Sequence, residues 1–100
     1  MPSELLDLFL DAAGVRQAIG TVAKRASYLD VAVQPQKGAA RRRAALGEAT
    51  EALLAGRAEA VQLRYRARDG AWSDTVTRAG NRYRLLRVSR GPGSGVVGTE

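Results

Sequence analysis

The sequence predicts an α+β fold in which two helices precede a three-stranded antiparallel β-meander with a flexible C-terminal tail. Apolar residues recur at helical spacing in the first half of the chain and alternate with polar residues from Val61 onward. Asp69-Gly70, between two alternating segments, is a strong signal for a hairpin turn. With 100 residues, we expect one small domain over residues 1–90 and a glycine-rich tail over 91–100.

The N-terminal segment predicts one long helix over residues 3–29. Its apolar residues are separated by steps of three and four, which keeps them on one helical face. Gly14 lies within this row, so two helices broken at Gly14 are the alternative. In that case Ala13-Gly14-Val15 resembles the turn of a helix-turn-helix motif, although the residues four before and six after the glycine do not fit it. The row consists of Leu5, Leu8, Ala12, Val15, Ile19, Val22, Ala26 and Leu29.

The middle of the chain predicts a linker and a second helix. Residues 30–38 contain Pro35 and Gly38, which disfavour a helix there. A helix over residues 39–55 follows, and Gly56 is well placed to end it. We interpret the three arginines at 41–43 as its solvated start, and a dedicated anion clamp is the alternative.

The C-terminal half predicts three strands joined by tight turns. If Asp69-Gly70 forms the first turn, Tyr65 faces Asp74 and the apolar residues of both strands share one side. In the third strand the alternation slips at Leu85-Leu86, which predicts a β-bulge. The expected strands span residues 61–68, 71–77 and 82–89.

The two sides of the expected meander differ in chemistry. We expect the helices to cover the apolar side, which includes Tyr65, Trp72 and Tyr83. The opposite side gathers arginines beside a row of hydroxyls, and the chain's excess charge of +6 lies almost wholly within residues 61–90. Such a surface suits phosphates or an acidic protein. The predicted arginines are Arg64, Arg66, Arg68, Arg82, Arg84 and Arg87, and the hydroxyls are those of Ser73, Thr75 and Thr77.

The aromatic residues and the single aspartate on the apolar side lead to two further predictions. Sheet-based RNA readers stack bases on exposed aromatic residues, but Tyr65, Trp72 and Tyr83 are all expected to face the core. That argues against base stacking and leaves only contacts with backbone phosphates. Asp74 is the one charged residue on this side, and we expect the Tyr65 hydroxyl or an arginine to pair with it.

The composition excludes several kinds of chemistry. The chain has no cysteine and no histidine, so it has no disulfides, no Cys/His zinc site and no histidine acid–base catalysis. No carboxylate pair or phosphate-binding loop is evident, and we expect neither an enzyme nor a cofactor or metal. No signal peptide or membrane-spanning run is visible, so we expect a cytoplasmic protein.

These observations favour a non-enzymatic accessory protein that docks to a partner or to itself. Much of the apolar content is alanine, so the core is thin for the length of the chain and a partner would add stability. The expected partner is an acidic protein surface or a second copy of the chain. Nucleic acid, held by its phosphates on the arginine side, is the alternative. The expected helical interface consists of Leu5, Leu8, Val15, Ile19 and Val22.

Overall fold

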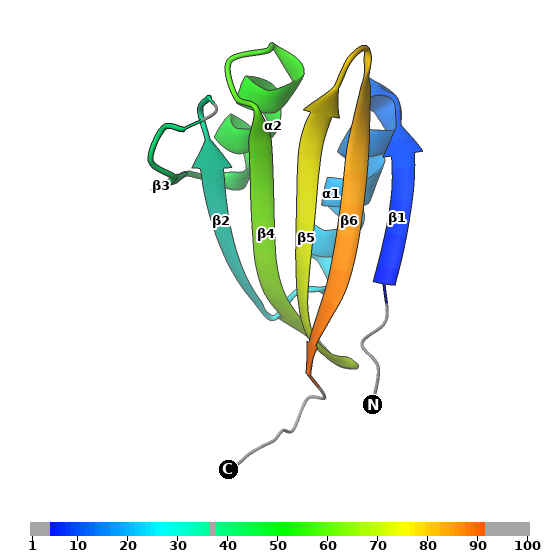
Figure 1. Cartoon of the computed structure of the whole chain (residues 1–100). Coiled ribbons are helices and arrows are strands. Elements are labelled where there is room, and N and C mark those ends of the chain that lie inside the picture. The colour runs from blue at the N-terminus through cyan, green and yellow to red at the C-terminus, as the bar shows by residue number, and fades with distance from the viewer. Residues whose placement is uncertain (1–4, 37, 92–100) are drawn as a thin grey trace.

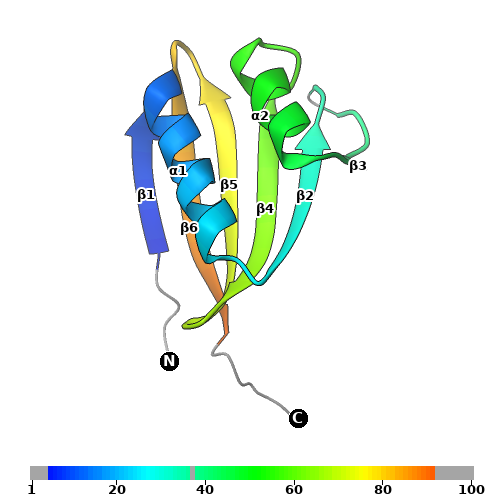
Figure 2. The same cartoon turned by 180° about the vertical axis from the view of Figure 1, so that it is seen from behind.

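The computed structural model describes residues 5–36 and 38–91 as one antiparallel sheet with two helices packed on one side of it (Figures 1 and 2). The sheet has six strands in the order β1-β6-β5-β4-β2-β3. The elements are β1 (Leu5–Leu10), α1 (Ala12–Arg25), β2 (Tyr28–Gln34), β3 (Arg42–Arg43), α2 (Leu46–Leu54), β4 (Ala60–Ala67), β5 (Gly70–Ala79) and β6 (Arg82–Gly91). The prediction of a long helix with a three-stranded sheet is therefore wrong.

The long helix expected over residues 3–29 is replaced by β1, α1 and β2. Asp11 separates the first two elements, because its carboxylate accepts a hydrogen bond from the Gly14 amide at 2.8 Å and caps α1. The helix runs unbroken through Gly14. The leucines of β1 fit both a helical and an alternating pattern, and pairing with β6 selects the strand.

The second helix is shorter than the expected 39–55. Arg42–Arg43 pairs with β2 instead of joining the helix, and α2 begins at Leu46. Pairing with a neighbouring strand thus overrides the helix propensity of this alanine- and arginine-rich segment. Gly56 adopts a φ of 83° immediately after the helix, which confirms its predicted role as the C-terminal stop.

The three expected C-terminal strands are present as β4, β5 and β6, at the centre of the larger sheet. The pairing in their first hairpin is shifted by two residues, because Arg68 and Asp69 form the loop in place of Asp69 and Gly70, and Tyr65 pairs with Trp72 instead of Asp74. A shift by an even number leaves every side chain on its expected face. Of the tail expected at 91–100, Gly91 belongs to β6 instead, and residues 92–100 lie outside the described residues.

The prediction of a β-bulge at Leu85-Leu86 is wrong. Pairing between β5 and β6 is regular there, and the one irregularity lies at Ala71/Trp72. Arg87 consequently points to the same side as Leu85, toward the helices, and Leu86 points away from them. A charged residue is tolerated on the helix side because Asp74 lies directly opposite it.

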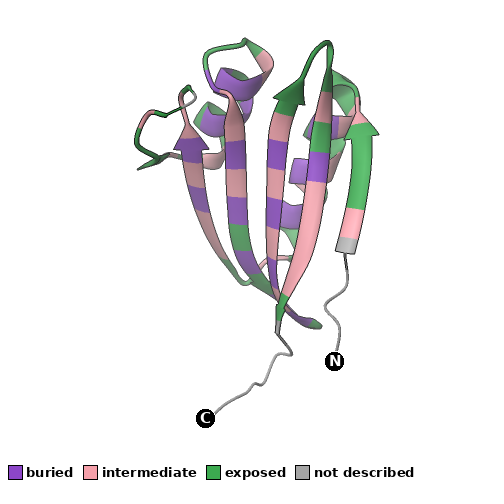
Figure 3. Ribbon diagram, viewed as in Figure 1, coloured by how far each residue is buried: buried purple, intermediate pink, exposed green. Residues whose placement is uncertain are grey.

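The core lies between the helices and one side of the sheet. Along β4 and β5, buried residues alternate with more exposed ones, which gives the banded pattern in Figure 3. No helix covers the other side of the sheet within the described residues, and we call this side the open face. The buried core includes Val15, Ile19 and Val22 of α1, Leu53 of α2, and Val61, Leu63, Tyr65, Trp72, Val76 and Leu85 of the sheet.

Candidate functional site

The open face is the surface on which most of the predicted arginines lie. The registers of the six strands fix which residues share it. One cross-strand row runs from Phe9 through Arg84 and Thr77 to Ala60 and Gln34, and the next rows lie parallel to it. The other members are Asp7 on β1, Tyr28, Asp30 and Ala32 on β2, Gln62, Arg64 and Arg66 on β4, Ala71, Ser73 and Thr75 on β5, and Arg82, Leu86 and Val88 on β6.

Three arginines of the open face have no acidic partner among the described residues. Arg64, Arg66 and Arg82 are exposed, and none of them belongs to an ion pair. Arg68 is also exposed, at the tip of the β4–β5 hairpin. These side chains are therefore free to meet an anionic group from outside.

Arg84 lies on the open face as predicted but is already engaged. Its Nη2 lies 2.7 Å from Oδ2 of Asp7, and its Nε donates to Oδ1 at 2.9 Å. The hydrogen bond from Arg84 lowers the pKa of Asp7. This pair links β1 to β6, so Arg84 contributes to the sheet and less to a binding surface.

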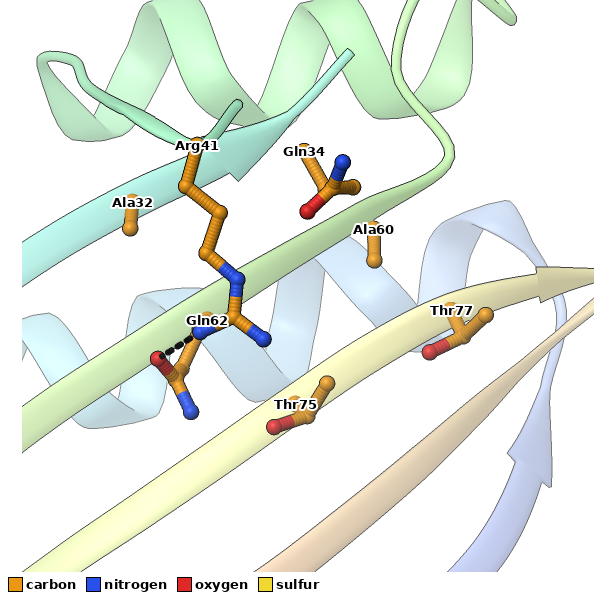
Figure 4. Close-up of a pocket in the computed structure, with 7 residues that line it drawn as sticks. All are labelled: Ala32, Gln34, Arg41, Ala60, Gln62, Thr75 and Thr77. Carbon is orange, nitrogen blue, oxygen red and sulfur yellow. Dashed lines mark hydrogen bonds between the residues drawn. The ribbon is translucent and has the colours of Figure 1, made fainter. Parts of the chain in front are cut away.

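A hollow of about 190 Å³ lies on the open face beside the hydroxyl row (Figure 4). Arg41 extends over it, and its Nη1 donates to Oε1 of Gln62 at 3.0 Å. The short side chains of Ala32 and Ala60 leave the space open, and Gln34, Thr75 and Thr77 complete its lining. The sequence marked Arg41 only as part of a solvated basic run, because its position over the hollow depends on the pairing of β2 with β3 and β4.

Two aromatic residues project from the open face, contrary to expectation. Phe9 is 58% exposed and Tyr28 is 59% exposed. Each lies directly across from an arginine, Phe9 from Arg84 and Tyr28 from Arg66. The predicted placement of Tyr65 and Trp72 in the core is confirmed. Phe9 and Tyr28 were missed because their segments were expected to be helical.

The five residues of the expected helical interface do not form one exposed helical surface. Val15, Ile19 and Val22 are buried against the sheet, where they form part of the core. Leu5 and Leu8 belong to β1 and not to a helix. The helical spacing of the apolar residues is present within α1, but these residues pack into the core of the domain.

Arg87 and Asp74 meet on the helix side of the sheet. Arg87 donates from Nε and Nη2 to the two carboxylate oxygens at 2.9 and 2.8 Å, and the Tyr65 hydroxyl donates to Oδ1 at 3.2 Å. Both kinds of partner predicted for Asp74 are therefore present. Burial, followed by the nearby charge of Asp74, raises the pKa of Tyr65 to about 12. Arg87 is accordingly removed from the predicted arginine surface.

The described part of the chain shows neither a metal-binding cluster nor a membrane-spanning helix. No three acidic, histidine or cysteine residues there gather closely enough to hold a metal ion. Neither α1 nor α2 has the length and hydrophobicity that a membrane crossing requires. Comparison of the chain with protein-family models, with curated proteins and with solved structures finds no match.

Proposed function

We propose that this protein is a non-enzymatic accessory protein that binds an acidic protein partner on its open face. The observation that carries this proposal is that Arg64, Arg66 and Arg82 are exposed on a side of the sheet that no described helix covers, and that no described residue forms an ion pair with them. Arg64 and Arg66 lie two residues apart on β4, whereas Arg82 lies beside the β5–β6 turn at the other end of the sheet. Guanidinium groups bind carboxylates through two parallel hydrogen bonds, so this side of the sheet suits a partner surface rich in Asp and Glu.

The polar centre of the open face supports the same function. Thr75 and Thr77 present hydroxyls along the middle of the sheet, and hydroxyls can donate to a carboxylate. The hollow beneath Arg41 has room for one acidic side chain of the partner. A basic surface with a small hollow fits a docking role better than catalysis, which needs a nucleophile or base held beside its substrate.

Single-stranded nucleic acid is the second candidate, and the exposed aromatic residues favour it. Bases stack on exposed aromatic rings, and phosphates pair with arginine. Phe9 and Tyr28 flank the arginines on opposite sides of the open face. Loss of binding in Phe9→Ala and Tyr28→Ala would identify this mode, because contacts with an acidic protein rely less on stacking.

The test compares two probes and two matched variants. A labelled polyglutamate peptide and a labelled oligothymidylate are titrated against the full chain at low and at physiological salt. Arg64→Gln with Arg66→Gln removes two charges from the open face. Lys24→Gln with Arg57→Gln removes two charges elsewhere, from exposed residues that also lack ion pairs.

The open-face variant is expected to bind polyglutamate about tenfold more weakly or worse, because charge-assisted hydrogen bonds are lost. The control variant is expected to stay close to the original chain. Equal losses in both variants would mean that only net charge matters, which would contradict a defined site. Binding of the oligothymidylate alone would replace the first candidate by the second, and binding of neither probe at low salt would contradict both.

A further inference from the structure

Strand β1 forms an apolar edge of the sheet. Of the described residues, the large hydrophobic ones that stay exposed are Leu8, Phe9 and Tyr28, and the first two are neighbours on β1. β1 pairs with β6 on one side, and no strand of the described residues lies on the other. An edge strand carries backbone N–H and C=O groups that are free to pair with another strand.

The opposite edge of the sheet has fewer backbone groups that are free to pair with another strand. There β3 pairs with Ala32 and Val33, and the Ala44 amide donates to the Val31 carbonyl, so the chain itself covers the central part of β2. β3 has only two residues, and both are exposed arginines whose ion pairs, Arg42 with Glu48 and Arg43 with Asp30, are 3.5 Å long. A short, charged edge strand disfavours pairing with another strand. β1 is longer, with six residues, and all of them except Asp7 are apolar.

We infer that β1 pairs with β1 of a second copy of this chain, antiparallel and about a two-fold axis at Leu8, so that the two sheets become one. The inference rests on the self-complementarity of the strand. Directly opposite residues in an antiparallel pair point to the same side of the sheet. An axis perpendicular to the sheet must therefore pass through a residue and not between two.

The axis at Leu8 gives the best match among these registers. It places Leu6 opposite Leu10 of the second copy and Leu8 opposite Leu8, which forms a continuous leucine row on the helix side. Asp7 then lies opposite Phe9 of the second copy. An axis at Asp7 would set two carboxylates against each other, and an axis at Phe9 would leave Leu6 unpaired.

This pairing is independent of binding on the open face, which stays uncovered in the dimer. The chain has no cysteine, so Leu8→Cys introduces a single thiol at the proposed axis. Opposite residues in an antiparallel pair have Cα atoms about 4.5–5.5 Å apart, which suits a disulfide. Tyr28→Cys is the matched control, because Tyr28 is more exposed than Leu8 but lies far from β1 in the strand order.

Under mild oxidation of the dilute full-length protein, Leu8→Cys is expected to form a covalent dimer at least about tenfold faster than Tyr28→Cys. Sedimentation of the unmodified chain is expected to show a dimer that Leu8→Lys converts to a monomer and Tyr28→Lys does not. Equal cross-linking of the two cysteine variants, or a monomer at every concentration, would overturn the inference. If Leu8→Lys fails to fold, the comparison of Leu8→Cys with Tyr28→Cys alone tests the inference. Arg64→Gln with Arg66→Gln should leave the dimer intact, so the two proposals fail separately.

Discussion

Asp74 and Arg87 lie directly opposite each other on β5 and β6 and form a two-point ion pair on the helix side of the sheet. Asp74 is 1% exposed, whereas the Arg87 side chain reaches the edge of the core. The Tyr65 hydroxyl supplies a third hydrogen bond from β4. The three central strands are thus joined by side chains as well as by their backbones.

Replacement of Arg87 should lower the free energy of unfolding of the protein strongly. Arg87→Leu leaves the Asp74 carboxylate buried without its charged partner, and we expect a loss of about 3–5 kcal/mol in the free energy of unfolding. Asp74→Leu with Arg87→Leu should recover much of that loss, because no charge then remains buried. Urea denaturation measures all three proteins. A loss from Arg87→Leu no greater than that from the same change at exposed Arg84 would contradict the role of the pair.

Alkaline pH should destabilise the protein through Tyr65. The pKa of this phenol rises from 10.0 in the unfolded chain to about 12 in the fold. The neutral form is therefore favoured by folding, and its contribution is complete below pH 10 and is lost as the pH rises through about 12. Tyr65→Phe should show a flatter fall of unfolding free energy over that interval. Identical slopes for the two proteins would be inconsistent with this assignment.

Acid should act on Asp69, which accepts a hydrogen bond from the indole nitrogen of Trp72 at 3.0 Å. That bond is the main reason why the pKa of Asp69 lies below 3.8. Its contribution to stability is present above pH 3.8 and is lost as the pH falls through the lowered pKa. Trp72 is the single tryptophan, so its fluorescence should report the titration with a midpoint below 3.8. Asp69→Asn should abolish that transition, and its survival would point to another group.

Two glycines should respond in opposite directions to alanine. Gly56 has a φ of 83°, so Gly56→Ala should cost about 1–2 kcal/mol of stability. Gly47 lies in α2 with open space around its Cα, so Gly47→Ala should stabilise the helix by up to about 1 kcal/mol. Thermal unfolding of both variants measures the difference. A stabilising Gly56→Ala would contradict the helix end described here.

The C-terminal half of the fold could be predicted because its local signals agree with its tertiary contacts. Alternation from Val61 identified the three central strands and placed Trp72 in the core and Arg64 and Arg66 on the opposite side. The turn was misplaced by one residue and the strand pairing by two, yet the side chains stayed on their expected faces because the side-chain period is two. The same period explains why the position of Arg87 was predicted wrongly. The bulge assumed at Leu85-Leu86 would have moved Arg87 to the open face, but the pairing is regular and Arg87 lies on the helix side.

The N-terminal half could not be predicted because its pattern fits two structures. Leu6, Leu8 and Leu10 are spaced by two, yet with their neighbours they also extend the helical row of α1. Only pairing with β6, some 75 residues later along the chain, selects the strand. Phe9 and Arg41 reach the open face through such long-range pairing, so no local signal reveals them.

Mapping of the open face by NMR tests the central claim most directly. The isotope-labelled chain is titrated with the polyglutamate peptide at physiological salt, and backbone amide shifts are followed. We predict that the largest changes lie at Arg64, Arg66, Ser73 and Thr75, with α1 and α2 largely unaffected. Changes concentrated on the helices, or no changes while the peptide is in excess, would contradict a binding role for the open face.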